Sequence, residues 1–201
     1  MSPIFRCADG SYRFSAGPTV FVFEPARALD GIRCTWNGVS VCVPLADASA
    51  GEGTAGALVL DREENGVVRA EYAGGLTLRV RMWEGALVVD VTTRRGCAGE
   101  VNMGRVLTDF EVQDLPVSGM TWRDGEEGRV SLVRGGAGRS DLFVGVWPDW
   151  TRSNASEWQP AGAGSAAGSH GRMLYRAQTD GRKNRVFERL FICVSPRYED
   201  V

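Results

Sequence analysis

Apolar and polar residues alternate with a period of two along most of this 201-residue chain. In the run GLTLRVRMW, Leu78 and Val80 fall on one face of an extended strand, whereas Arg79 and Arg81 fall on the other. A Glu-Gly pair then gives a turn, after which ALVVDVTT repeats the alternation. Because successive side chains of a strand point to opposite faces, the pattern predicts a hairpin of two strands that each bury one face.

The same pattern recurs in further runs separated by Gly, Asn or Asp: PTVFVFE, GIRCTW, VSVCV, GALVLD, GVVRAEY, GRVSLV, LFVGVW, RMLYRAQ and VFERLFICV. No window keeps a helical apolar stripe for three turns, and we interpret residues 100–116 as strand with loop. The sequence therefore predicts an all-β antiparallel sandwich with little or no helix, with a supersandwich or a flattened barrel as related forms. We expect one domain over residues 1–201, because the strand pattern continues on both sides of the small-residue tracts 46–57 and 161–171.

The inward-facing positions of these runs predict the core. We expect seven residues to be buried there: Leu78, Val80, Val89, Val91, Phe143, Leu190 and Ile192.

Charge and composition set limits on partners and location. The net charge is -2 and no basic stripe follows the sequence, so we expect no nucleic-acid partner. No apolar run approaches the ~20 residues of a membrane span, and because MSPIFRCADG has no charged leader followed by an apolar stretch we expect no signal peptide. The five cysteines are scattered without a CxxC pair. We therefore expect buried free thiols at Cys34, Cys42 and Cys193, no structural zinc and a reducing, cytoplasmic location.

The sequence offers few candidates for catalysis, and the catalytic residues remain unknown. His170 is the only histidine, and a solvated loop residue is favoured over a general base. Asp90 and Glu188 lie inside apolar strands. Either would be an acid/base candidate with a raised pKa if it faced the interior, but the alternation favours a solvent-facing side chain. No GxSxG, Walker or GxGxxG pattern is present, and we expect no metal and no cofactor.

Three of the six tryptophans lie in one segment, VWPDWTRSNASEWQP, residues 146–160. Indoles stack on the apolar faces of sugar rings, and neighbouring polar side chains can bind ring hydroxyls. The predicted ligand-binding residues are Trp150, Trp158, Asp149, Arg152, Asn154, Glu157 and His170. The alternative is that the indoles only pin a long loop to the sandwich. Trp147 ends an apolar strand and is expected at the edge of the core, with Trp150 and Trp158 as an exposed aromatic wall.

A stretch of about 25 residues, ALVVDVTTRRGCAGEVNMGRVLTDF, resembles the aldose epimerase (galactose mutarotase) proteins. It is similar to a family strand ending in Thr-Thr, a polar turn, and a strand that begins Val-Asn. The resemblance implies a sandwich associated with carbohydrate. It does not extend to mutarotase activity, because Met103, Gly104 and Arg105 stand where the family has a histidine.

We therefore expect a carbohydrate- or polyol-binding module or accessory subunit, with its ligand at the aromatic loop Trp147–Trp158. An enzyme acting on a carbohydrate-like or other small polar substrate through carboxylates such as Asp149 and Glu157 is one alternative. A structural subunit, with an aromatic interface to a protein partner or to a second copy of the chain, is the other.

Overall fold

The computed structural model has an all-β fold, as the alternation predicted. It describes residues 4–50, 56–92, 101–102, 104–115, 121–122, 125–126, 129–135, 140–149, 156–159, 172–175 and 187–201. The described helices are two short 3-10 helices, η1 (Pro25–Gly31) and η2 (Tyr198–Asp200). The strands are β1 (Ile4–Arg6), β2 (Tyr12–Ala16), β3 (Thr19–Phe23), β4 (Ile32–Trp36), β5 (Val39–Ala46), β6 (Ser49–Ala50), β7 (Leu58–Glu64), β8 (Val67–Tyr72), β9 (Thr77–Trp83), β10 (Ala86–Thr92), β11 (Val101–Asn102), β12 (Arg105–Leu107), β13 (Val112–Leu115), β14 (Thr121–Trp122), β15 (Gly125–Glu126), β16 (Arg129–Val133), β17 (Leu142–Pro148), β18 (Ser156–Gln159), β19 (Arg172–Tyr175) and β20 (Phe187–Ser195).

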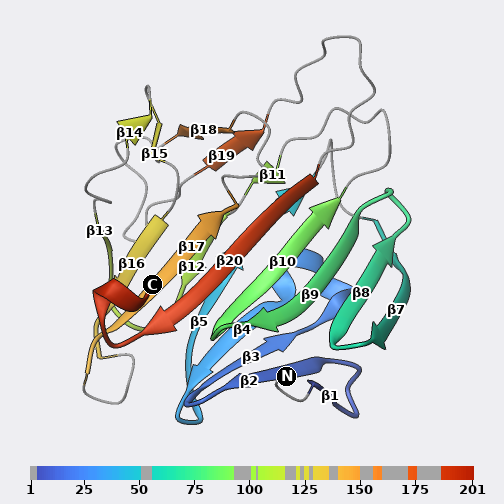
Figure 1. Ribbon diagram of the computed structural model, residues 1–201, viewed down its shortest axis with the longest axis horizontal. Helices are drawn as coiled ribbons and strands as arrows, with labels where there is room; N and C mark the ends of the chain where they lie inside the picture. Colours follow the sequence, from blue (N-terminus) through green and yellow to red (C-terminus); the bar gives the residue numbers. More distant parts are fainter. Residues whose placement is uncertain are drawn as a thin grey trace.

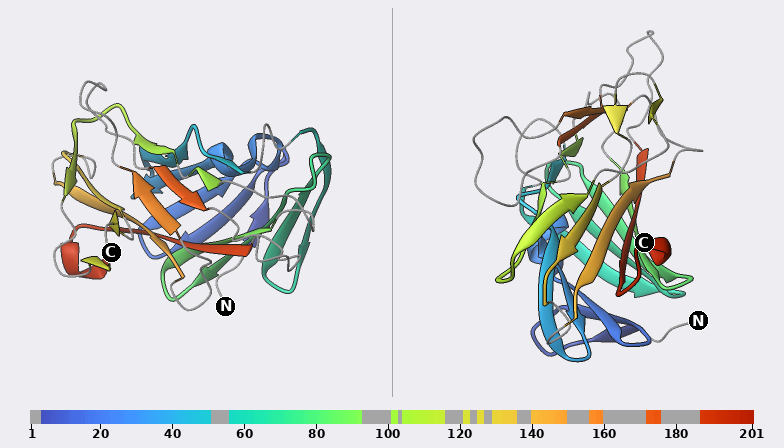
Figure 2. Two further views of the ribbon diagram at one scale, coloured as in Figure 1. Left: turned by 90° about the horizontal axis from the view of Figure 1, so that it is seen from above. Right: turned by 90° about the vertical axis from the view of Figure 1, so that its left-hand side faces the viewer.

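Two antiparallel sheets form the sandwich. The smaller has the strand order β1-β2-β3-β4-β5-β12, and the larger has the order β13-β16-β17-β20-β10-β9-β8-β7. Neither sheet closes on itself, since each order has two different edge strands. The smaller sheet lies behind the larger one in Figure 1, and the larger sheet curves around it in Figure 2. We call the side of the larger sheet that faces away from the smaller sheet the outer face.

Strand β20 lies in the middle of the larger sheet. It pairs with β10 on one side, where Leu87 is opposite Ile192. It pairs with β17 on the other side, where Val146 is opposite the same Ile192. Figure 1 shows this strand, in red, between the green β10 and the orange β17. Among the described strands, the two halves of the larger sheet are therefore paired with each other through β20 alone.

The core lies between the two sheets and confirms most of the predicted inward-facing positions. Leu78, Val80, Val89, Val91, Leu190 and Ile192 are fully buried there. Fully buried aromatic side chains from the smaller sheet fill the opposite side of the core: Tyr12, Phe14, Phe21 and Phe23. This burial follows from the period-two pattern, because successive side chains of a strand point to opposite faces and the inward positions of these strands are apolar.

Phe143 is a wrong prediction of the core. In the run LFVGVW the inward positions belong to Leu142, Val144 and Val146, which are fully buried. Phe143 is therefore on the outer face of β17, where its ring meets the edge of Tyr198 from η2 at a centroid distance of 5.7 Å. The sequence is apolar on both faces of this strand, so its hydrophobicity does not distinguish the two.

Three two-residue hairpin turns share one backbone conformation: Asn37-Gly38, Asn65-Gly66 and Glu84-Gly85. Their first residues have φ of 48°, 53° and 48°, and their glycines have φ of 81°, 78° and 89°. Two successive positive φ values define the turn that fits the twist of paired strands. Asn-Gly suits that turn, whereas a glutamate at its first position is strained.

Four described cysteines are free thiols: Cys7, Cys34, Cys42 and Cys193. Cys34 lies directly opposite Cys42 across β4 and β5, and both are buried as predicted. Cys193 is only partly buried, because it alternates with core residues and so faces outward. Burial nevertheless raises the pKa of its thiol to about 11. Within the part of the chain that the structure describes, no helix is long and apolar enough to cross a membrane.

Candidate ligand-binding surface

The structure describes part of the predicted aromatic loop. Asp149 follows β17 directly, and Glu157 and Trp158 belong to β18, which pairs with β19 so that Trp158 is opposite Met173. For these two β18 residues only the backbone is described. The other predicted site residues lie outside the described residues: Trp150, Arg152, Asn154 and His170.

Trp147 lies within β17 but not at the edge of the core, where we expected it. Its neighbours in the strand, Val144 and Val146, point into the core, so Trp147 points to the outer face together with Gly145. A Cβ atom at Gly145 would lie only 2.7 Å from the indole Nε1 of Trp147 and 3.1 Å from the carbonyl carbon of Val201. The glycine therefore leaves room for the indole to lie over the sheet, beneath the end of the chain.

Two further aromatic residues extend this surface across the sheet. Phe191 of β20 is directly opposite Trp147. Trp83, at the end of β9, has its ring centroid 5.8 Å from that of Phe191, at an interplanar angle of 52°. Trp83 is 54% exposed, a large value for an indole. We call Trp83, Phe191 and Trp147 the aromatic patch of the outer face.

A charged cluster lies beside the aromatic patch on the same face. Asp90 of β10 is only 5% exposed and accepts three hydrogen bonds. Its Oδ1 is 2.6 Å from Arg189 Nε, and its Oδ2 is 2.9 Å from Arg81 Nη1 and 3.1 Å from Arg189 Nη2. Arg189 is also 3.6 Å from the Asp149 carboxylate. The Asp149 backbone N–H donates to the Arg189 carbonyl at 2.7 Å, which fixes the start of the aromatic loop to β20.

Asp90 points outward from β10 as expected, but it is not exposed to solvent as we expected. Its side chain is on the outward side of β10, as the alternation favoured, but the two arginines cover it. Burial alone would raise its pKa, yet the hydrogen bonds and charges of Arg189 and Arg81 outweigh burial and hold the pKa below its ordinary value. A carboxylate that two guanidinium groups keep ionised is suited to fixing those groups rather than to donating protons.

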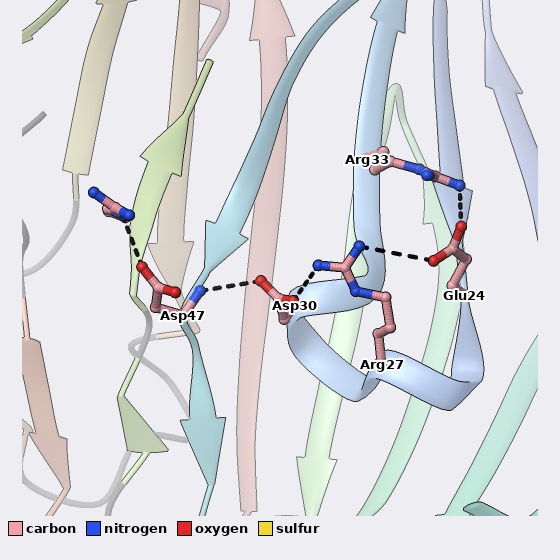
Figure 3. A network of polar contacts seen from close by, with 6 residues as sticks. Glu24, Arg27, Asp30, Arg33 and Asp47 are labelled. Atoms are coloured by element: carbon pink, nitrogen blue, oxygen red, sulfur yellow. Dashed lines mark hydrogen bonds and ion pairs between the residues drawn. The ribbon is translucent and has the colours of Figure 1, made fainter. Parts of the chain in front are cut away.

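A second polar network lies at the smaller sheet and has a structural role. It joins Glu24, Arg27, Asp30, Arg33, Asp47 and Arg105, as Figure 3 shows. Asp30 accepts the backbone N–H of Asp47 at 3.1 Å, and Arg105 Nε is 2.7 Å from the Asp47 carboxylate. These contacts fasten η1 to the end of β5, around Ala28 with its strained φ of 52° and ψ of -130°. Because its charged groups are satisfied by one another, we do not consider it a ligand site.

The described residues contain no group of three or more His, Cys, Asp or Glu side chains that could hold a metal ion. Aromatic rings and guanidinium groups are the side chains that the outer face brings together around Asp90.

Sequence reasoning missed Trp83 and Phe191. A signal for Trp83 was present, since the alternation in GLTLRVRMW places it on the same face as Arg79 and Arg81. Phe191 gave no such signal, because the run RLFICV is apolar on both faces of β20. Only the pairing of β9, β10 and β20 brings the two rings together.

A scan against models of known protein families and a search of curated protein sequences found no match to this chain.

Proposed function

We propose that this chain is a binding module for a carbohydrate or a similar polyhydroxylated ligand. The ligand lies on the aromatic patch and on the loop Trp147–Trp158 that continues from it. The observation that carries the proposal is the position of Trp147. Its indole lies on the outer face beside Phe191, not in the core, so the tryptophan-rich segment starts on a partly exposed aromatic surface.

The polar groups beside the patch suit binding better than catalysis. Arg81, Arg189 and Asp90 are held in fixed positions by their mutual hydrogen bonds. Fixed donors next to an indole can select the orientation of ring hydroxyls at a small entropic cost. The low pKa of Asp90 argues against its use as a general acid, which needs a raised pKa.

We further propose a reducing, cytoplasmic location for the protein. Its support is that Cys34 and Cys42 face each other across two strands and still carry free thiols. Mass spectrometry of the protein alkylated directly in a cell extract tests this, with a disulfide between these cysteines as the contradicting result.

A glycan array and a thermal-shift screen with soluble saccharides test the binding function. Trp83→Ala and Trp147→Ala should each weaken binding of the saccharide that the array identifies by about tenfold or more, as loss of a stacking residue does. Trp150→Ala and Trp158→Ala should do the same while leaving thermal stability nearly unchanged. Phe5→Ala is the matched control, because Phe5 is 58% exposed on β1 of the other sheet.

The stability of Trp147→Ala separates a ligand site from a structural pin. We expect a cost of about 1–2 kcal/mol, below the ~3–5 kcal/mol of a fully buried large aromatic residue, because the indole is only partly buried. Unfolding of the Trp147, Trp150 and Trp158 variants to a similar extent, with no saccharide bound by the parent protein, would contradict the proposal.

A further inference from the structure

A row of three arginines crosses the same outer face as the aromatic patch. Arg62 of β7 is directly opposite Arg69 of β8, and Arg69 is directly opposite Arg79 of β9. Val68 and Leu78, which directly precede Arg69 and Arg79, are fully buried in the core. Because successive side chains of a strand point to opposite faces, the arginines point outward. Side chains that face each other on neighbouring strands lie about 5 Å apart at their Cβ atoms. We call Arg62, Arg69 and Arg79 the arginine row.

Like charges placed directly opposite each other destabilise a sheet. Two members of the row have a carboxylate on their own strand: Arg62 Nη1 is 3.3 Å from Glu64, and Arg69 Nη2 is 2.7 Å from Glu71. The Nε atom of Arg69 is buried without a hydrogen-bond partner in the described structure. The row is therefore kept at an energetic cost that its carboxylates offset only in part.

Arg79 is the member of the row without an ion-pair partner among the described residues. It is exposed, and none of the ion pairs among the described residues includes it. The carboxylate opposite it is Asp90, but both oxygens of Asp90 already accept hydrogen bonds from Arg81 and Arg189. An anion approaching Arg79 would meet a guanidinium group without an ion pair among the described residues, and Arg69 beside it, although paired with Glu71, adds positive charge.

The arginine row and the aromatic patch belong to one continuous surface. Arg79 and Trp83 both point outward from β9, four residues apart, which corresponds to about 13 Å along a strand. Arg81 lies between them and is fixed by Asp90 at 2.9 Å. A ligand that stacks on Trp83 and reaches Arg79 is therefore extended and carries a negative charge away from its stacking ring.

We propose that the ligand of this surface is an acidic oligosaccharide, in which one sugar ring stacks on Trp83 and the carboxylate of a further uronic acid unit pairs with Arg79, beside Arg69. This inference rests on the proposed carbohydrate-binding function and adds the chemical class of the ligand. Bidentate pairing of guanidinium with carboxylate supplies the selectivity for the acidic sugar. Occupation by the anion also relieves the repulsion within the arginine row.

Isothermal titration calorimetry with matched pairs of saccharides tests this proposal. The probes are oligosaccharides of galacturonate, mannuronate and glucuronate, each compared with its methyl ester, in which the carboxylate charge is removed. At least one acid should bind about tenfold more tightly than its ester, the scale expected for one charge-assisted hydrogen bond. Its affinity should fall as NaCl is raised, because the pair is exposed.

Two arginine variants locate the site. Arg79→Gln should weaken binding of the acid by about tenfold and leave binding of the ester unchanged. Arg13→Gln is the control, since Arg13 is exposed on β2 of the other sheet. The melting temperature of Arg79→Gln should be equal to or above that of the parent, because the change removes a like charge from the row.

The other results have distinct meanings. If acids and esters bind equally and Trp83→Ala weakens both, the carbohydrate function stands and the acidic ligand is wrong. If no saccharide binds, both proposals fail. If Arg79→Gln leaves acid binding unchanged, the anion site is not at the arginine row. Equally tight, Arg79-dependent binding of an oligoglutamate peptide would show a general acidic-partner surface and overturn the assignment to a saccharide.

Discussion

Asp90 shows how a single residue organises the outer face. It is almost completely covered, yet it remains ionised because Arg81 and Arg189 together provide three hydrogen bonds to its two oxygens. Removing one member of such a buried charged group leaves the others without their counter-charge. The cluster should therefore matter for stability as well as for the position of the two guanidinium groups.

Asp90→Asn is expected to lower the free energy of unfolding by about 2–4 kcal/mol at neutral pH. The asparagine keeps the shape of the side chain but can offer neither the charge nor two acceptor oxygens. Urea unfolding followed by circular dichroism measures the loss. Asp47→Asn is the matched control: Asp47 also pairs with an arginine, but its side chain is 70% exposed, so we expect a change within about 1 kcal/mol.

The same residue predicts a pH dependence. Because the folded pKa of Asp90 lies below its ordinary value of 3.8, its contribution is complete above that value and is lost as the pH falls through the folded pKa. The difference in stability between the parent and Asp90→Asn should thus be constant from pH 7 to about 5. It should shrink below pH 4, and a difference independent of pH down to acid unfolding would contradict this account.

At the scale of single elements, the hairpin turns offer the sharpest comparison. Glu84-Gly85 adopts the same backbone conformation as Asn37-Gly38 and Asn65-Gly66, but a glutamate occupies the first position. Asparagine tolerates a positive φ better than glutamate does, because its short polar side chain can bond to the local backbone. The β9–β10 hairpin is therefore less well specified by its turn than the other two.

Glu84→Asn should raise the free energy of unfolding by about 0.5–1 kcal/mol. Asn65→Glu, the reverse change in the β7–β8 hairpin, should lower it by a similar amount. Chemical denaturation with both variants checks the pair. Equal effects of the same sign from the two substitutions would show that the shared turn conformation does not set their energies.

The alternation predicted the strands better than it predicted which face each side chain occupies. In β9 it assigned Leu78 and Val80 to the core and Arg79 and Arg81 to the other face correctly, because apolar and charged residues alternate there. In β17 it failed for Phe143 and Trp147, because that strand is apolar on both faces and the second apolar face packs under η2 or stays partly exposed. The arginine row could not be predicted, since its members come from three strands and only the pairing register places them side by side.

At the scale of the whole molecule, the larger sheet depends on β20. This strand pairs with β10 and β17 along most of its length, and its core residues Leu190 and Ile192 are fully buried. The segment that follows it has a smaller role: Tyr198 meets Phe143 edge-on, and Val201 lies near Gly145. The two segments should therefore respond very differently to deletion.

A chain ending at residue 186 is expected not to fold, because β10 and β17 would both lose a partner strand and the core would open. A chain ending at residue 195 should keep the β-sheet spectrum and lose only about 1–3 kcal/mol, the order of partial loss of two apolar contacts. Size-exclusion chromatography and far-ultraviolet circular dichroism distinguish these states. A folded monomer from the shorter chain would show that the two halves of the sheet are independent.

The position of β20 near residue 190 also determines the order in which the two sheets can form during synthesis. The smaller sheet is a run of neighbouring hairpins from β1 to β5, which can pair as each strand is synthesised. The larger sheet must wait, because β10 and β17 each present an open edge until residues 187–195 have left the exit tunnel. Open edges recruit strands from other molecules. Nascent chains on one polysome are therefore at risk of exchanging this strand, and a chaperone that shields strand edges would be needed until synthesis of β20 is complete.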